Sequence, residues 1–374
     1  MYAPSVPRTI SRPWTIVTVA LLAGCAAPAD PSPATSDRGS PTTTTSALPA
    51  ASVPAESVAP SSAASPPPLA WDQLEVAGPP PREDHTWTLA ADGTTAYLFG
   101  GRDGTTAYGD LWAFDLATDE WSTLAAGDGP APRFGHEAAW VEDVGLVIFA
   151  GQAGTTFFDD LWAFDPVSQT WRALPSGGAA PVARYGTCAA IGPDGRLWIS
   201  HGFTADGTRF SDTRAYDFAS GTWSDETPNG EVPLIRCLHG CWWTASGELA
   251  LFGGQTTGVT ALDDRWVLVD DGWTRVDGTG PPARNLYARA RLEGATLIFG
   301  GQSLDGARLD DLWVLLDDGE AAQLTPEGTP PGRSGAEMVV DAGRGRVLLF
   351  GGLGTDGVLD DAWALAGDPL QAAP

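Results

Sequence analysis

Short apolar runs recur along the chain from residue 69 onward, and each is bounded by glycine, proline or aspartate. Residues 95–99, 145–149 and 295–299 (TAYLF, GLVIF and ATLIF) are examples. Runs of this length, rich in β-branched and aromatic residues and flanked by turn residues, are typical of β-strands. No long stripe with a period of 3.6 residues interrupts them, and 46 Gly and 31 Pro supply turns throughout. The pattern predicts an all-β fold.

The runs fall into a unit of about 50 residues, a period typical of propellers and other repeat folds. An arginine that follows a Pro-rich turn opens each copy: Arg82, Arg133, Arg184, Arg236, Arg284 and Arg333. A pair of small residues ends the second run in most copies: Gly100-Gly101, Ala150-Gly151, His201-Gly202, Gly253-Gly254, Gly300-Gly301 and Gly351-Gly352. The sequence therefore contains six registered repeats.

Two tryptophan positions complete the unit. The first belongs to an Asp-x-Trp element, with tryptophans at Trp112, Trp162, Trp266, Trp313 and Trp363, and the third copy has Arg214 instead. The second falls at Trp121, Trp171, Trp223 and Trp273, and the fifth copy lacks it. Large flat side chains at fixed repeat positions are typical of packing between neighbouring sheets. Each copy thus predicts a four-stranded antiparallel blade, and the whole predicts a six-bladed β-propeller.

The two ends of the repeat region predict how the ring closes. The sixth copy stops after Trp363-Ala364-Leu365 and has no fourth strand, whereas Trp71-Asp72-Gln73-Leu74 matches the fourth-strand segment that begins at Trp121. We expect the N-terminal strand near Trp71 to complete the last blade and so remove open sheet edges. The predicted propeller covers residues 69–366, and residues 367–374 form a C-terminal tail.

The combination of Pro-Arg-x-x-His, Phe-Gly-Gly, Asp-Leu-Trp and a later Trp resembles the Kelch repeat, over nearly all of residues 69–366. The resemblance implies a Kelch-type β-propeller. It leaves the function open, because Kelch propellers include enzymes, peptide binders and scaffolds.

The N-terminus has the features of a bacterial export signal over residues 1–24. Arg8 and Arg12 precede a short apolar run, and the segment ends Leu22-Ala23-Gly24-Cys25, which resembles the bacterial lipobox. That resemblance implies lipidation of Cys25; an ordinary signal peptide with a chance cysteine is the alternative. Residues 25–68 are rich in Ser, Thr, Ala and Pro and predict a disordered tether. We expect a lipid-anchored protein of the cell envelope, outside the cytoplasmic membrane.

Charge and cysteine content narrow the partners further. The formal net charge is −26, and all 21 basic residues are arginine, which argues against nucleic acid as a partner. Cys188, Cys237 and Cys241 permit one disulfide with one thiol left over, and the spacing leaves the pairing open. A metal site that uses His239 is a weaker alternative, because no second cluster of Cys or His accompanies it.

The six repeat arginines are the first candidate ligand-binding residues. They begin the innermost strand of each blade, so we expect Arg82, Arg133, Arg184, Arg236, Arg284 and Arg333 at the mouth of the central channel. They could bind a carboxylate, an acidic sugar or an acidic peptide. Alternatively each pairs with a nearby aspartate: Asp110, Asp160, Asp212, Asp264, Asp311 or Asp361. Their regular repetition favours the structural alternative for most of them.

Departures from the repeat give the other candidates. His201 replaces a glycine and Arg214 replaces a tryptophan in the third copy, so we place a candidate ligand site in the sector of blades three and four. His85, His136 and His239 each follow the repeat arginine by three residues, which favours a packing role. The Asp-Gly pairs, such as Asp305-Gly306, could suggest calcium, but tight hairpin turns require the same dipeptide.

The connections between the runs are uniformly short, so no insertion is present to carry a catalytic constellation. We therefore predict a module that binds a protein, peptide or glycan through the arginine-lined face. The alternative is a sugar-active enzyme, similar to a Kelch epimerase or mutarotase and less closely to a copper oxidase. We expect a monomeric domain with neither cofactor nor metal.

Overall fold

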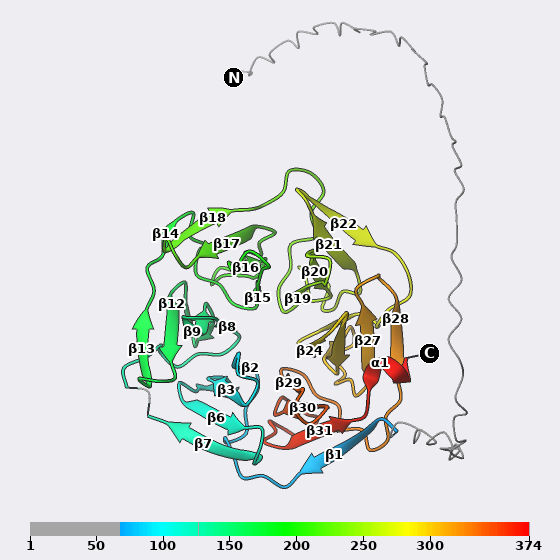
Figure 1. Ribbon diagram of the computed structural model, residues 1–374. Helices are drawn as coiled ribbons and strands as arrows, with labels where there is room; N and C mark the ends of the chain where they lie inside the picture. The colour runs from blue at the N-terminus through cyan, green and yellow to red at the C-terminus, as the bar shows by residue number, and fades with distance from the viewer. Residues whose placement is uncertain (1–67, 126, 374) are drawn as a thin grey trace, which may run out of the picture. The chain divides into compact units, whose positions relative to one another are not determined.

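The computed structural model describes residues 68–125 and 127–373. The predicted signal segment, Cys25 and the tether up to residue 67 lie outside the described residues. Six sheets of four antiparallel strands surround a central channel, as Figure 1 shows. The prediction of an all-β, six-bladed propeller is confirmed.

Each blade uses consecutive strands from the channel outward. Blade one contains β2 (Thr86–Leu89), β3 (Thr95–Phe99), β6 (Leu111–Asp115) and β7 (Glu120–Leu124). Blade two contains β8 (Glu137–Val141), β9 (Gly145–Phe149), β12 (Leu161–Asp165) and β13 (Thr170–Ala173). Blade three contains β15 (Cys188–Ile191), β16 (Leu197–Ser200), β17 (Thr213–Asp217) and β18 (Thr222–Asp225), with the short β14 (Gly177–Gly178) parallel to β18.

The remaining blades follow the same order. Blade four contains β19 (Gly240–Trp243), β20 (Leu249–Phe252), β21 (Arg265–Val269) and β22 (Gly272–Val276). Blade five contains β24 (Ala288–Leu292), β25 (Ala295–Phe299), β27 (Leu312–Leu316) and β28 (Ala321–Leu324). Blade six contains β29 (Glu337–Asp341), β30 (Arg346–Phe350), β31 (Ala362–Ala366) and β1 (Ala70–Leu74).

Short strands form hairpins between the second and third strands of several blades. They are β4 (Arg102–Asp103) with β5 (Thr106–Ala107) in blade one and β10 (Gln152–Ala153) with β11 (Thr156–Phe157) in blade two. In blade five, β26 (Gln302–Ser303) pairs instead with β23 (Arg284–Asn285), which precedes the first strand of that blade. Because strands alternate in direction, these hairpins and the connections that enter each blade share one face of the disc. We call it the hairpin face. The turns between the first and second strands of each blade lie on the opposite face.

The N-terminal strand closes the ring. Strand β1 pairs antiparallel with β31, and the register places Trp71 beside Leu365 and Gln73 beside Trp363. The chain then ends in the short helix α1 (Pro369–Ala372), within the predicted tail. In the described part of the chain no helix is long and apolar enough to cross a membrane.

The second tryptophan of the repeat packs between blades. Its ring contacts the phenylalanine that ends the second strand of the preceding blade, with centroid separations of 5.2 Å for Trp121 and Phe350 and 5.0 Å for Trp223 and Phe149. These contacts exclude water from the seams between blades. They agree with the packing role that the tryptophan spacing predicted.

A ring of backbone hydrogen bonds surrounds the channel near the hairpin face. The donors and acceptors are the residues two positions after each repeat arginine: Asp84, Gly135, Gly186, Leu238, Leu286 and Gly335. Each N–H donates to the carbonyl of the equivalent residue in the preceding blade over 2.8 to 3.2 Å. All six have positive φ, including the non-glycine Asp84, Leu238 and Leu286. The ring ties every blade to its neighbour through main chain alone.

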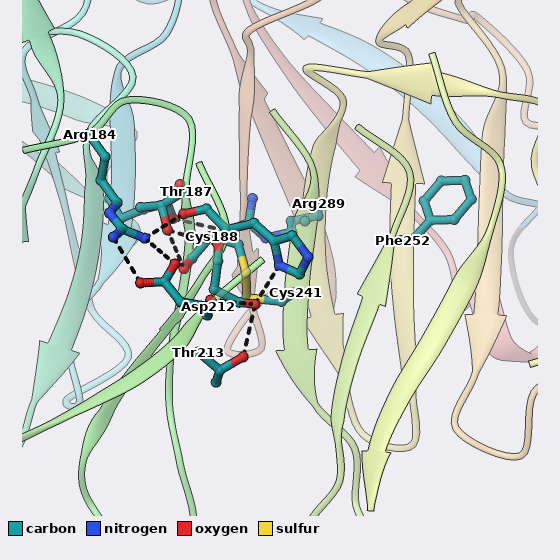
Figure 2. Close-up of a disulfide and its surroundings, with 12 residues drawn as sticks. Arg184, Thr187, Cys188, Asp212, Thr213, Cys241, Phe252 and Arg289 are labelled. Atoms are coloured by element: carbon teal, nitrogen blue, oxygen red, sulfur yellow. Dashed lines mark hydrogen bonds and ion pairs between the residues drawn. A yellow bond between two sulfur atoms is a disulfide. The ribbon is translucent and has the colours of Figure 1, made fainter. Parts of the chain in front are cut away.

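The seam between blades three and four differs from the others. Ser200 stands where most blades have the seam phenylalanine, and it pairs across the strands with Cys188. Cys188 forms a disulfide with Cys241 of β19, so a covalent bond joins the innermost strands of the two blades (Figure 2). Cys237 remains a buried thiol. The tryptophan of this seam, Trp273, belongs to the same buried cluster as the disulfide.

Candidate functional site

The repeat arginines lie inside the blades. In Arg82, Nη1 and Nη2 donate to the two carboxylate oxygens of Asp110 over 2.9 and 2.8 Å. Nη1 also donates to the Gly100 carbonyl (2.8 Å), and Nε donates to the Pro80 carbonyl (3.1 Å). The guanidinium therefore connects the entry into the blade, the end of its second strand and the start of its third.

All six arginines repeat this geometry. The aspartate partners of Arg133, Arg184, Arg236, Arg284 and Arg333 are Asp160, Asp212, Asp264, Asp311 and Asp361. The six side chains are at most 1% exposed. The expected placement around the channel mouth is therefore wrong: the blade itself occupies four of the five N–H groups of each guanidinium, as in Arg82. The structural alternative, an Arg–Asp pair that also binds turn carbonyls, is the observed arrangement.

The aspartates remain ionised in these pairs. Burial alone would raise the pKa of Asp110, but the hydrogen bonds and charge of Arg82 and the indole N–H of Trp112 hold that pKa below its ordinary value. In blade four, Arg236 and the indole N–H of Trp266 lower the pKa of Asp264 in the same way, against the raising effect of burial. A bidentate, buried pair of this kind fixes geometry strongly.

Arg214 performs the structural task of the tryptophan that it replaces. In the other five blades the Trp indole donates to the aspartate, as Trp162 does to Asp160 (2.8 Å). In blade three Arg214 Nε donates to Asp212 over 3.1 Å, and Nη1 pairs with Asp225 at 3.2 Å. Its charge is thus already matched by two carboxylates. Arg214 was a candidate for ligand binding; its side chain is partly exposed, but its charge is paired within the blade.

The histidines are buried and neutral. His201 is fully buried, and its Nδ1 lies 2.6 Å from the Ser200 hydroxyl, while burial first and the charge of Arg236 second lower its pKa to about 3. Burial also holds the pKa values of His85, His136 and His239 well below the usual range. The packing role expected for these three agrees with their places in the seams. His201 offers no accessible ring nitrogen to a ligand.

The channel mouth on the hairpin face is closed on one side. Asp84 of blade one accepts hydrogen bonds from the Tyr185 hydroxyl of blade three (3.2 Å) and pairs with Arg102 at 2.9 Å. The Arg102 guanidinium also lies over the Phe134 ring, 4.4 Å from its centroid. Glu83, beside Arg102, has a pKa raised to about 7, mainly by burial and by the charge of Asp84. These groups cover the mouth over blades one to three.

The hairpin face carries accessible chemistry elsewhere, at the seam of blades three and four. Val182, Leu234 and Ile235 are 53%, 59% and 42% exposed. Val182 and Leu234 occupy the position two residues before the repeat arginine, where blades one, five and six have proline. Isolated exposed apolar residues are ordinary, but a group on one ledge is characteristic of a binding surface.

A cavity of about 510 Å³ lies beside this ledge, and Figure 2 shows the Arg184–Asp212 pair that lines it. Val182, Ile235 and Phe210 supply its apolar wall, and Arg209 supplies a cation. Arg209 makes no ion pair within residues 68–125 and 127–373, although 13 other arginines there do. We call Val182, Leu234, Ile235, Phe210 and Arg209 the seam ledge.

The sequence predicted this sector from the wrong residues. His201 and Arg214 are internally bonded, whereas the seam ledge consists of residues that were not singled out. The signal was available, since Val182 and Leu234 break the Pro-rich pattern before the repeat arginine. The seam ledge contains no histidine, and no group of three or more His, Cys, Asp or Glu side chains that could hold a metal occurs among the described residues.

The channel itself contains a second group that sequence reasoning missed. Glu137 of β8, Arg289 of β24 and Glu337 of β29 lie in the innermost strands and line the channel. Arg289 pairs with Glu137 at 3.3 Å. Charged residues within a strand that is predicted to be innermost would have identified them.

Comparison with known proteins supports the repeat assignment. Residues 66–254 match a family model described as the KLHDC2/KLHL20/DRC7 Kelch-repeats domain. The match covers about half of the chain and includes the first three blades and part of the fourth.

Curated relatives match over shorter stretches. Acyl-CoA-binding domain-containing protein 4 of Arabidopsis thaliana is 35% identical over 83 residues, which is 21% of this chain and 12% of that protein. Acyl-CoA-binding domain-containing protein 5 of the same plant is 38% identical over 71 residues, 18% of this chain and 11% of the relative. Tip elongation aberrant protein 1 of Schizosaccharomyces pombe is 27% identical over 211 residues, 52% of this chain and 18% of the relative.

The chain therefore spans less than a fifth of the length of these relatives, so the likeness concerns the repeat and not their other domains. Six blades with the arginine, glycine-pair and tryptophan landmarks in register agree with the family match. From its repeats, its fold and this match, the chain belongs to the Kelch-repeat family of β-propeller proteins.

Proposed function

We propose that this propeller is a protein-binding module that holds an extended segment of its partner on the seam ledge. Kelch propellers serve in general as protein-binding modules, and the seam ledge is the observation that gives this one a location. Val182, Leu234 and Ile235 are exposed together beside a cavity, and Arg209 adds a cation without a carboxylate partner among the described residues. An apolar rim around a cavity with a few placed charges is typical of a peptide-binding site, and here Asp212 and Asp225 line the cavity together with the arginines.

The chemistry of the seam ledge defines the partner segment. Phe210 and Ile235 line a cavity that can hold an apolar side chain. The Arg209 guanidinium can donate hydrogen bonds to a carboxylate of the partner close to that side chain. The formal net charge of −26 repels strongly acidic proteins. The preferred partner therefore has an apolar residue next to a single carboxylate, rather than a long acidic run.

Selection of peptides from a random display library on the purified full chain tests the proposal. Peptides that combine an apolar residue with Asp, Glu or a free C-terminus should be enriched. Ile235→Asp and Arg209→Ala should each lower the affinity for the selected peptides at least tenfold in a fluorescence-anisotropy titration. Val167→Asp is the matched control, because Val167 is 93% exposed in the turn between β12 and β13, on the opposite face.

Three results would contradict the proposal. One is a selection without enrichment, and another is peptides that bind Ile235→Asp as well as the unaltered chain. The third is a glycan array in which a sugar, and no peptide, is retained by the same ledge. Tryptophan fluorescence of each variant verifies that the propeller is folded.

We further propose that the module is anchored in the cell envelope through Cys25. The support is the resemblance of residues 22–25 to the lipobox and the Ser/Thr/Pro-rich segment that follows. Metabolic labelling with an alkyne fatty acid should label the unaltered chain and leave Cys25→Ala unlabelled. Recovery of unlabelled Cys25 peptide from the membrane fraction would contradict the anchor.

A further inference from the structure

The half of the channel that faces away from the hairpins is a cavity of about 510 Å³. The innermost strands of all six blades contribute to its wall, from β2 to β29. Much of the wall is small or apolar: Ala138, Ala189, Ala190, Ala290, Met338 and Val340. A volume of this size accommodates a small organic molecule.

Three ionisable side chains lie at the inner end of this cavity, where it meets the small space below the backbone ring. Glu137 pairs with Arg289 at 3.3 Å, and their side chains are 15% and 23% exposed, toward the channel. The Glu337 side chain makes no hydrogen bond or ion pair with any other described residue, although Glu337 lines both spaces. The inner end therefore has two carboxylates and one guanidinium.

No neighbouring group supplies the missing positive charge. Arg291, farther along β24, pairs with both oxygens of Asp317 over 2.8 and 2.5 Å. Asp84, which lines the adjoining space with Glu137, Arg289 and Glu337, pairs with Arg102. His85, His136 and His239 line the adjoining space in the neutral form, because burial lowers their pKa values. Burial raises the pKa of Tyr287, so its hydroxyl stays neutral as well.

The charge imbalance is expressed in the protonation of the carboxyls. Burial raises the pKa of Glu137 to about 7 against the lowering effect of Arg289. Burial, opposed by Arg289 and reinforced by Glu137 and Asp84, raises the pKa of Glu337 to about 8. At neutral pH a carboxyl of this group is therefore protonated, which reduces the negative charge that Arg289 alone does not balance. A ligand cation beside these carboxyls would favour their ionised form and release the proton.

The opposite face, on which the cavity lies, also favours cations. The turns between the first and second strands carry Asp92, Glu142, Asp143, Asp194, Glu248 and Glu293. Two cations lie in the same set of turns: Arg196 of blade three pairs with Asp194, and Arg344 of blade six pairs with Asp119. Acidic turns around an opening raise the local concentration of cationic ligands.

From this geometry we infer that the channel binds an aliphatic di- or polyamine, with one ammonium group between Glu137 and Glu337 and the methylene chain along the alanine-rich wall. A second ammonium group lies toward the acidic turns. Inner strands of four or five residues, at about 3.3 Å per residue, give the channel the length for such a chain. This site is separate from the seam ledge and does not depend on the proposed protein partner.

Isothermal titration calorimetry of the full chain with spermidine tests the inference. We expect saturable one-to-one binding at pH 7, with proton release that appears as different apparent enthalpies in phosphate and HEPES buffers. Glu337→Gln should weaken binding at least tenfold and reduce the proton release. Glu120→Gln removes the same charge from an exposed position in β7 and should leave the affinity unchanged.

A second variant, Glu137→Gln, keeps the test decisive if Glu337→Gln fails to fold, and it should also weaken binding at least tenfold. The inference is overturned if spermidine does not saturate, if the Glu337 and Glu120 variants bind alike, or if a neutral or acidic monosaccharide binds in its place. Failure of spermidine binding leaves peptide capture on the seam ledge unaffected, because the two sites share no residue.

Discussion

The hydroxyl of Tyr185 donates to Asp84 over 3.2 Å and so joins the third blade to the first across the channel mouth. The contact passes over the second blade, where Gly135 has φ +56° and a Cβ atom would lie 1.8 Å from the Tyr185 ring. Absence of a side chain in one blade is therefore the condition for a hydrogen bond between its two neighbours. Together with Arg102, this contact holds a carboxylate that is almost completely buried.

Tyr185→Phe should lower the free energy of unfolding by about 1–3 kcal/mol, because it removes a donor from the buried Asp84 carboxylate. Urea denaturation followed by tryptophan fluorescence measures the change. Tyr97→Phe is the matched control, since Tyr97 is buried and its hydroxyl makes no hydrogen bond to a described residue. Equal losses in the two variants would show that the Tyr185–Asp84 bond contributes nothing specific.

Arg184→Ala should destabilise the propeller by about 3–5 kcal/mol, since it leaves the Asp212 carboxylate with Arg214 alone and removes the donor of the Val182 and His201 carbonyls. The expected result in thermal denaturation is a lower Tm or loss of the fold. Arg172→Ala, at an exposed arginine of β13, controls for loss of one positive charge. A folded Arg184→Ala protein with unchanged Tm would mean that the repeat arginines are available for binding after all.

Arg214→Trp should retain most of the stability, because an indole N–H at this position donates to the aspartate in the five other blades. Arg214→Ala provides no donor and should lose about 1 kcal/mol or more. Urea midpoints of the two variants give the comparison. If tryptophan is as damaging as alanine, Arg214 has a role other than replacement of the indole.

Removal of the disulfide by Cys188→Ala with Cys241→Ala should lower the free energy of unfolding by about 4 kcal/mol, from the lost restriction of an unfolded loop with a sequence separation of 53. Cys237→Ala should change it much less. Peptide mapping without reduction should yield a crosslinked peptide that contains Cys188 and Cys241. A crosslink between Cys237 and Cys241 would contradict the observed pairing.

Glu337→Gln should change the pH dependence of stability. The pKa of Glu337 is raised from 4.5 to about 8 in the folded chain, so the folded state binds more protons than the unfolded state between these values. The free energy of unfolding of the unaltered chain therefore falls as pH rises through this window. The stability of Glu337→Gln relative to the unaltered chain should increase from pH 5 to pH 8.5 in urea titrations. A constant difference would show that Glu337 is ionised normally.

The fold was predictable because the same residue types recur at equivalent positions of the six repeats. Tryptophans such as Trp121, the repeat arginines and the glycine pairs recur at fixed spacings, and the residues at each position make similar contacts in most blades. The ring closure followed from the same logic, since Trp71 supplies the strand that the copy ending at Leu365 lacks. Repetition averages out the ambiguity of any single short strand.

The candidate site was harder to predict because its residues are exceptions to the repeat. A charged residue at a repeat position, such as Arg184, suggests a ligand, although its burial in an Arg–Asp pair depends on contacts that sequence spacing does not reveal. Arg214 appeared to be a departure but preserves a hydrogen bond. Conversely, Glu337 occupies an ordinary strand position, and only the closed ring brings Glu337 and Arg289, which lie in neighbouring blades, close to Glu137 of the second blade. Sequence order carries no direct information about which blades face each other across a channel.

The pairing of Ala70 with Ala366 has a consequence for biosynthesis. Strand β1 has no partner until β31 has been made, so the sixth sheet is completed only after the strands of the other five blades have been synthesised. Blades one to five are contiguous in sequence and can form in the order in which they are synthesised. Pairing of β1 with β31 therefore follows the synthesis of the other blades. A truncation that removes only β31 leaves both β1 and β30 as open edges, exposed to pairing with other chains.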